Sequence, residues 1–112
     1  MSPHTITLFR ALADGTRIRL LALLHERPQC VEDLAFALGI RQPKASRHLA
    51  YLRRVGLVKR TRSGRRIFYG FRAPTDPFER RLLGELLAHL EASAAVASDR
   101  RRLDRAASRS RV

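Results

Sequence analysis

The sequence has no tryptophan, one methionine and one cysteine among its 112 residues, and aromatic residues make up only 6% of it. A single cysteine excludes an internal disulfide and is typical of a reducing, cytoplasmic setting. No apolar run reaches the roughly 20 residues that span a bilayer. The first residues also lack the basic-then-apolar order of a signal peptide. We therefore expect a cytoplasmic protein with no membrane partner.

Acidic residues are absent from a long central stretch. From Arg41 to Arg72 the chain has eleven Lys or Arg and no Asp or Glu, and all ten acidic residues lie outside this stretch. The whole chain carries a net charge of +13. Because the positive charge is concentrated in one segment, it indicates a polyanionic partner rather than only a soluble basic surface.

Enzymatic motifs are also missing. The chain has no Gly-rich phosphate loop, no paired carboxylates in an expected cleft and no nucleophile with a base at a suggestive spacing. We therefore expect a protein that is not an enzyme and needs no cofactor.

The segment 41–54 lies in the acid-free stretch and predicts an amphipathic helix. At 3.6 residues per turn, Ala45, Leu49 and Leu52 share one face, and Arg47 and Arg54 lie on the opposite face. Pro43 is compatible with the first turn, whose N–H groups have no helical partners. Such a helix packs along a narrow apolar seam and presents a basic face outward, as a DNA recognition helix does.

The preceding segment 31–40 predicts a short helix that ends at Gly39, a residue suited to the left-handed conformation. A short helix, a glycine turn and a second helix form the helix-turn-helix layout, which we place at 31–54. In that motif the second helix enters the major groove of double-stranded DNA.

Two strand patterns follow, at 57–62 and 66–72, with Ser63-Gly64-Arg65 as the tip of a hairpin between them. A basic hairpin directly after a recognition helix is typical of the wing of a winged helix, which we place at 57–72. Its basic residues Arg62, Arg65 and Arg66 are positioned to contact phosphate or the minor groove. The alternative is an ordinary surface hairpin.

Apolar stripes at both ends predict a dimer. A first helix carries Leu8 and Leu12, a helix over 16–25 is apolar almost all round, and a long helix is expected over 78–96. We expect the two end helices to form an isologous interface that places two recognition helices about one DNA turn apart. The predicted interface residues are Leu8, Leu12, Phe78, Leu82, Leu83, Leu86 and Leu90. The Arg- and Ser-rich segment 97–112 is expected to be a disordered basic tail after a single domain at 1–96.

With this element order, the chain resembles the ArsR/SmtB family of arsenical-resistance repressors. The matching text is Leu8-Phe9-Arg10-Ala11-Leu12-Ala13-Asp14-Gly15-Thr16-Arg17-Ile18-Arg19-Leu20-Leu21, then Gln42-Pro43-Lys44-Ala45-Ser46-Arg47-His48-Leu49, Leu52-Arg53 and Gly56-Leu57-Val58. The family usually has Pro where this chain has Gly15. The resemblance implies a mainly α, winged helix-turn-helix fold with a small β-hairpin. It also implies a homodimeric repressor that binds an inverted repeat and is released by an inducer, here unknown.

The resemblance also suggests which residues contact DNA. Arg47 is the candidate for a bidentate pair with guanine, worth roughly 1–3 kcal/mol of discrimination. For His48, packing or a contact within the domain is as good an interpretation as contact with DNA. The full predicted set on the recognition helix is Gln42, Pro43, Lys44, Ser46, Arg47, His48 and Arg54. The competing interpretation is a nucleoid-associated or RNA-binding basic protein without sequence preference.

Two sensing sites known in the family are incomplete here. The arsenite-responsive Cys-Val-Cys-Asp-Leu segment corresponds to Cys30-Val31-Glu32-Asp33-Leu34, which has one thiol. The metal site of the last helix retains only Asp76 and His89, with Phe78 and Ala92 at its other two positions, and two ligands do not close a tetrahedral site. We therefore expect no metal. Cys30 at a helix N-terminus remains a candidate thiolate sensor, the alternative being an inert residue at a cap position.

Overall fold

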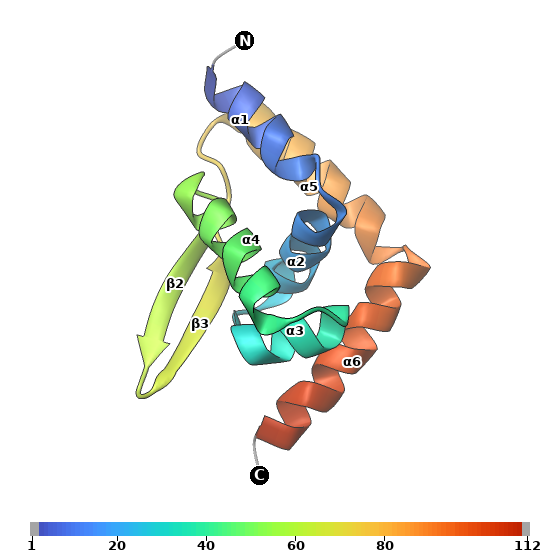
Figure 1. Ribbon diagram of the computed structural model, residues 1–112. Helices are drawn as coiled ribbons and strands as arrows, with labels where there is room; N and C mark the ends of the chain where they lie inside the picture. The colour runs from blue at the N-terminus through green and yellow to red at the C-terminus, as the bar shows by residue number, and fades with distance from the viewer. Residues whose placement is uncertain (1–2, 111–112) are drawn as a thin grey trace.

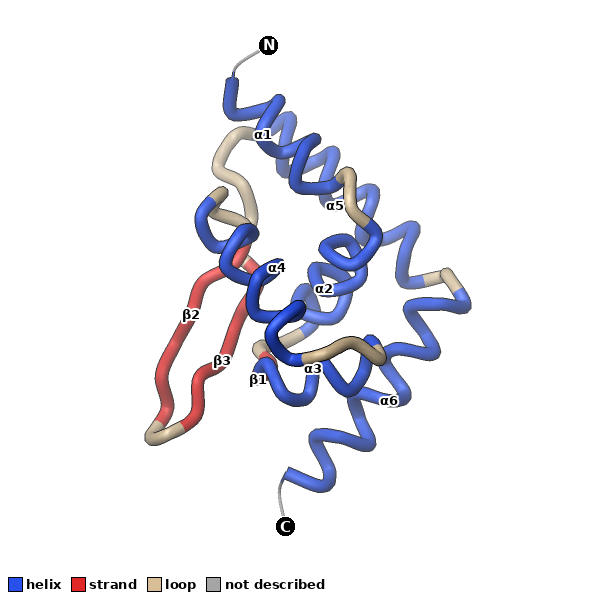
Figure 2. Tube along the Cα trace, viewed as in Figure 1, coloured by secondary structure: helices blue, strands red, loops and turns tan. Residues whose placement is uncertain are grey.

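The computed structural model describes residues 3–110, with the side chains of residues 3–109. Helices dominate the chain, and a small antiparallel sheet lies at one side of it (Figures 1 and 2). This confirms the predicted fold class. The elements in chain order are α1 (Pro3–Leu12), α2 (Gly15–Glu26), β1 (Gln29–Cys30), α3 (Val31–Leu38), α4 (Gln42–Arg54), β2 (Val58–Ser63), β3 (Arg66–Phe71), α5 (Pro77–Glu91) and α6 (Ala94–Ser110).

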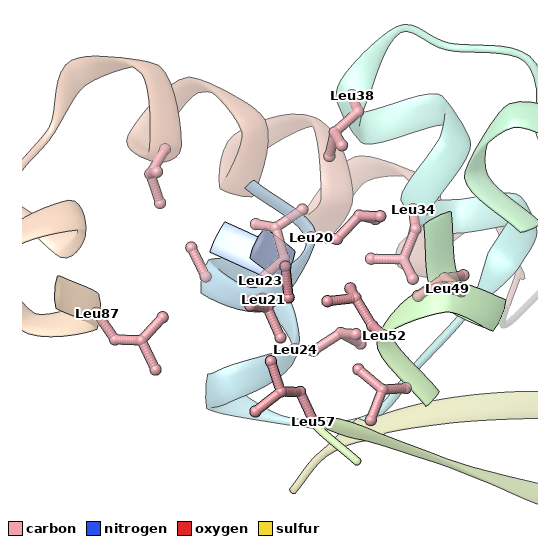
Figure 3. Packing of buried hydrophobic residues seen from close by; sticks show 14 of the residues in the cluster. Leu20, Leu21, Leu23, Leu24, Leu34, Leu38, Leu49, Leu52, Leu57 and Leu87 are labelled. Carbon is pink, nitrogen blue, oxygen red and sulfur yellow. The ribbon is translucent and has the colours of Figure 1, made fainter. Parts of the chain in front are cut away.

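The helix α2 forms the centre of the core. Its four leucines at 20, 21, 23 and 24 are each 1% exposed or less, and leucines of α3 and α4 pack around them (Figure 3). Burying one such side chain stabilises the fold by roughly 1.5–3 kcal/mol relative to leaving it in water. Asp14 caps the start of the helix, and its carboxylate accepts a hydrogen bond of 3.1 Å from the backbone N–H of Arg17.

The helix-turn-helix prediction is confirmed in its local details. Ala45, Leu49 and Leu52 of α4 are fully buried, which is the predicted apolar seam. Gly39 ends α3 with a φ of 67°, a conformation that favours glycine. Pro43 lies in the first turn of α4, where no backbone hydrogen bond is lost.

The hairpin is formed by β2 and β3, whose end pair Ser63 and Arg66 leaves Gly64 and Arg65 as the loop. Gly64 has a φ of 62°, which suits the first position of a two-residue hairpin loop. A third strand, β1, pairs with β3 through Gln29 opposite Tyr69. The strand β1 was not predicted, because a strand of two residues is too short to show an alternating pattern.

The C-terminal part of the chain differs from the prediction. The helix expected over 78–96 ends at Glu91, and α6 begins at Ala94 after a break at which the Ser93 hydroxyl accepts from the backbone N–H of Val96. The expectation of a disordered tail at 97–112 was wrong for residues 97–110, which belong to α6. Residues 111 and 112 lie outside the described part of the chain.

An ion cluster explains why α6 is ordered. The carboxylate of Asp99 is 1% exposed and accepts from Arg19 of α2 at 2.7 and 2.8 Å and from Arg102 at 2.6 Å. Arg102 also donates to the carbonyl of Ala37 near the end of α3, at 2.6 Å. The side chains of Val96, Leu103 and Ala106 are buried beside this cluster. Charge-assisted hydrogen bonds of this kind join α6 to both α2 and α3.

The two end helices α1 and α5 lie side by side at the end of the molecule away from the hairpin loop (Figure 1). The hydroxyl of Thr5 donates to the buried carboxylate of Glu79 at 2.7 Å and so joins them. Among the described residues, no helix combines the length and the apolar character needed to cross a membrane.

Candidate nucleic-acid interface

The outer face of α4 is polar, basic and accessible. Arg47 projects from it, one turn after Lys44 and on the side opposite the buried seam. Of the predicted residues, Gln42, Pro43, Lys44, Arg47 and Arg54 are exposed, whereas Ser46 and His48 are half-buried. Within α4 no acidic side chain neutralises this face.

An arginine of α2 holds the second half of α4 in place. The guanidinium of Arg17 lies 4.3 Å from the ring centroid of Tyr51 and donates through Nε to the carbonyl of Ala11 at 2.8 Å. Arg54 lies 5.3 Å from the same ring. Cation–π contacts of this geometry stabilise by about 0.5–1 kcal/mol where they are partly exposed. This arrangement was not predicted, since no local sequence pattern links residue 17 to residue 51.

His48 is half-buried on α4. Its charge is one of the influences that hold the pKa of Asp14 below its usual value; the largest is the hydrogen bond from the backbone N–H of Arg17. His48 forms no hydrogen bond or ion pair with the described side chains, so both interpretations of this residue stay predictions.

The arginines of the wing differ in what they contact. Arg65 is exposed in the loop, and Arg62 donates to the carbonyl of Gly64 at 3.1 Å. Arg66 instead turns back, with Nη2 at 3.1 Å from Sγ of Cys30 and its guanidinium 5.5 Å from the ring centroid of Phe68. Arg66 is therefore partly engaged within the protein.

A surface hollow joins the start of α4 to the wing. Gln42 and Ser46 line it from α4, and Arg65 and Arg66 line it from the hairpin. Glu32 is an acidic residue at its edge, and the remaining lining residues are Val31, Ile67 and Tyr69. The fold thus brings together two basic segments that the sequence analysis identified separately.

The thiol of Cys30 is buried at the start of α3. Its side chain is 1% exposed, and burial raises the pKa of the Cys30 thiol above its ordinary value. The residue occupies the cap position of α3 but makes no side-chain capping hydrogen bond. Burial opposes the thiolate that the helix dipole was expected to favour, whereas the guanidinium of Arg66 at 3.1 Å from Sγ favours it, so the sensor role of Cys30 stays a prediction.

The predicted remnant of a metal site is spread along α5. Asp76 caps the start of the helix by accepting from the backbone N–H of Glu79 at 2.9 Å, and His89 is exposed in the last turn. Thirteen residues of helix separate the two by roughly 20 Å within one protomer. In residues 3–110 no three His, Cys, Asp or Glu side chains cluster as a metal ion would require.

The predicted dimer residues fall into three groups. Leu8 and Leu83 are 4% and 1% exposed in the core of the protomer itself, so they were wrongly placed on an outer face. Phe78 is 52% exposed, and two residues of α1 outside the predicted set, Ile6 and Phe9, are 37% and 45% exposed. The half-buried members are Leu12, Leu82, Leu86 and Leu90. An apolar surface on α1 and α5 therefore remains open in the single chain.

A helix-turn-helix with a basic outer helix, followed by a hairpin, defines the winged helix-turn-helix class. The family model described as "Bacterial regulatory protein, arsR family" matches residues 14–60. The chain is 38% identical over 91 residues to the transcriptional regulator NmtR of Mycobacterium tuberculosis, covering 81% of this chain and 73% of that protein. The chain belongs to the ArsR family.

Other relatives agree. The arsenical resistance operon repressor of Escherichia coli is 48% identical over 65 residues, which are 57% of this chain and 56% of that protein. The match to the first curated relatives spans about half of their length, 49% and 56%. Among solved structures, reduced HlyU from Vibrio cholerae has a TM-score of 0.67 at 29% identity, covering 80% of this chain and 90% of that one. A homodimeric winged helix-turn-helix DNA-binding domain from Mycobacterium bovis has a TM-score of 0.63 at 30% identity, covering 80% and 82%.

Proposed function

We propose that this chain is a homodimeric, sequence-specific repressor of transcription that works in the cytoplasm and is not an enzyme. The observation that carries the proposal is the outer face of α4, where Lys44, Arg47 and Arg54 are exposed above a fully buried seam. The names of the relatives, which include an arsenical resistance operon repressor and several transcriptional regulators, support it.

The proposed docking follows from this geometry. The helix α4 enters the major groove with Arg47 directed at base edges, where a bidentate pair with guanine contributes roughly 1–3 kcal/mol of discrimination. Lys44 and Ser46 at the start of the helix bind phosphate, as does Gln42 beside the hollow. Arg62 and Arg65 of the wing contact the neighbouring backbone or the minor groove.

The proposed dimer uses the open apolar surface of α1 and α5. Ile6, Phe9 and Phe78 are the exposed members of that surface, and covering them in a two-fold contact would place two copies of α4 on one side of a duplex. Half-sites about 34 Å apart, one turn of DNA, would suit such a dimer. The homodimeric relative from Mycobacterium bovis supports this arrangement.

The proposal is tested by fluorescence anisotropy with the DNA upstream of the gene and with scrambled DNA of equal length, across a salt series. A preference of at least 10³-fold for the upstream fragment is expected of a specific repressor. Equal affinity for both fragments, declining with salt in parallel, would instead support the nucleoid-associated interpretation.

The role of Arg47 is tested by Arg47→Ala. We expect this variant to lose about 1–3 kcal/mol of preference for the upstream fragment, roughly 5- to 150-fold, while salt-sensitive binding to scrambled DNA survives. The matched control is Arg81→Ala on α5, which removes the same charge from an exposed position outside the proposed DNA-binding residues. Because Arg81 lies one turn from Phe78 of the proposed dimer surface, light scattering checks that the assembly state of this variant is unchanged. An unchanged preference in the Arg47 variant would refute this assignment.

A further inference from the structure

The arginines of α6 divide into two groups. Arg100 and Arg102 direct their guanidinium groups inward, to the carbonyls of Ala22 at 3.2 Å and Ala37 at 2.6 Å. Arg101 and Arg105 are exposed, and among residues 3–109 neither has an ion pair or hydrogen bond to a side chain. The first group holds the helix in place, and the second is not needed for that purpose.

The outward group forms a stripe. Arg101, Arg105 and Arg109 recur every four residues, so they lie on one side of the helix about 6 Å apart. The one acidic residue within this stretch, Asp104, is paired with Arg27 at 3.2 Å. The stripe therefore keeps its positive charge.

The stripe is attached to the helix-turn-helix. The guanidinium of Arg109 lies 5.2 Å from the ring centroid of Phe36, an exposed residue of α3. The buried cluster around Asp99 joins the same helix to α2 and α3. In Figure 1 the wing lies on one side of α4 and α6 on the other, and the C-terminal half of α6 reaches the end of the molecule where the wing loop lies.

We propose that Arg101, Arg105 and Arg109 form a second DNA-contacting surface, which binds backbone phosphates beyond the groove occupied by α4, on the side opposite the wing. This inference rests on the proposed function. Guanidinium groups about 6 Å apart suit successive phosphates of a strand, and rigid docking of α6 means that little ordering is needed on binding. Phosphate contacts of this kind raise affinity without adding sequence preference.

The test compares two double variants of the full chain with the unchanged protein. Arg101→Gln with Arg105→Gln removes two charges from the stripe but keeps Arg109 against Phe36. Arg10→Gln with Arg81→Gln removes two exposed charges from α1 and α5 and is the matched control. Because both residues lie beside the proposed dimer surface, this control is used only where its assembly state matches that of the unchanged protein. Anisotropy is measured on upstream and scrambled duplexes from 50 to 300 mM salt. Circular dichroism and light scattering establish that each variant is folded and that its assembly state is unchanged.

We expect the stripe variant alone to show a shallower dependence of log affinity on log salt. The slope should fall by about 0.9 for each phosphate that is no longer neutralised, hence by about 3.6 if four arginines of a dimer are replaced. The preference for the upstream fragment should stay unchanged. Hydroxyl-radical footprinting should show weaker protection at the outer edges of the site.

Several outcomes would overturn this inference, the proposed function or both. An unchanged slope in the stripe variant would mean that the stripe contacts no phosphate. An equal fall in both variants would mean that only the net charge of the protein acts. If the unchanged protein binds both duplexes equally while the stripe variant alone loses slope, the specific-repressor proposal fails and the stripe stands. If the unchanged protein binds neither duplex, both proposals fail.

Discussion

The helices α4 and α6 are both rich in arginine, and each packs on the core along one narrow face, yet they use their charges differently. The buried face of α4 is apolar, formed by Ala45, Leu49 and Leu52, and its basic residues point outward. The buried face of α6 includes a carboxylate, Asp99, which holds Arg102 of its own helix and Arg19 of α2. The arginines of α4 are exposed and available to a ligand, whereas some arginines of α6 attach that helix to α2 and α3.

This difference separates basic residues that stabilise the fold from those that are available for DNA. A guanidinium that donates to a buried carboxylate or to a helix-terminal carbonyl stabilises the fold and is therefore not available to contact DNA. Arg17, Arg19 and Arg102 belong to that group. The charge that can act on DNA is therefore smaller than the net charge of +13 suggests, and it is concentrated on α4, the wing and the outer side of α6.

The largest effect is expected from Asp99→Ala, which removes the acceptor at the centre of the α6 docking face. Two guanidinium groups, about one third exposed, would lose their partner. Breaking a buried ion pair costs about 3–5 kcal/mol, and partial access of water to both arginines places this change near 3 kcal/mol in the free energy of unfolding. Urea unfolding followed by circular dichroism measures it.

The matched control is Asp104→Ala on the same helix, whose pair with Arg27 is exposed at 60% and 49%. Exposed pairs contribute about 0–1 kcal/mol, so this variant should unfold close to the unchanged protein. Equal stability of the two variants would show that the cluster around Asp99 does not hold α6 in place. The proposed difference between the apolar docking of α4 and the ion-paired docking of α6 would then be wrong.

A pair of glutamine substitutions sharpens the contrast. Arg102→Gln should cost about 1.5 kcal/mol of unfolding free energy, because its hydrogen bonds to Asp99 and to the carbonyl of Ala37 are removed. Its preference between DNA sequences should not change. Arg47→Gln should do the reverse, with a stability change within about 0.5 kcal/mol and a loss of preference. If each variant changes both stability and sequence preference, the division into folding and binding arginines is wrong.

The sequence predicted α4 and failed on α6 for a physical reason. The seam of α4 consists of apolar residues at helical spacing, a local pattern that any window of the sequence reveals. In α6 the seam is interrupted by a charged residue whose partner, Arg19, lies 80 positions earlier. Composition alone then resembles a disordered basic tail, because the compensating ion pair is not local.

The candidate interface was predicted in the same partial way. Residues were assigned to the outer face of α4 correctly where periodicity decides exposure, as for Arg47 and Lys44. Periodicity could not show that Arg66 turns back to Cys30 or that the carboxylate of Asp14 lies near His48, since both depend on how α3, α2 and the hairpin meet. The burial of Leu8 and Leu83 was missed because one helical stripe can face either its own core or a partner.

The smallest effect is expected at the start of α2, beneath α4, where Asp14 caps the helix. Asp14→Ala should cost about 1 kcal/mol at pH 7, since the backbone N–H of Arg17 loses its acceptor. That hydrogen bond, assisted by the charges of His48 and Arg17, holds the pKa of Asp14 below its usual value. Because the pKa of Asp14 is lowered by folding, its carboxylate stabilises the folded state fully at a pH above the unfolded-state pKa of about 3.9. This stabilisation is lost as the pH falls through the folded-state pKa. The difference in the free energy of unfolding between the unchanged protein and Asp14→Ala should therefore narrow below about pH 4.

Asp14→Asn is the matched control, because asparagine caps without titrating. Urea unfolding from pH 7 to pH 2.5 measures the stability of the unchanged protein and of both variants. If the difference between the unchanged protein and Asp14→Ala stays constant with pH, the ionised carboxylate of Asp14 does not stabilise the start of α2.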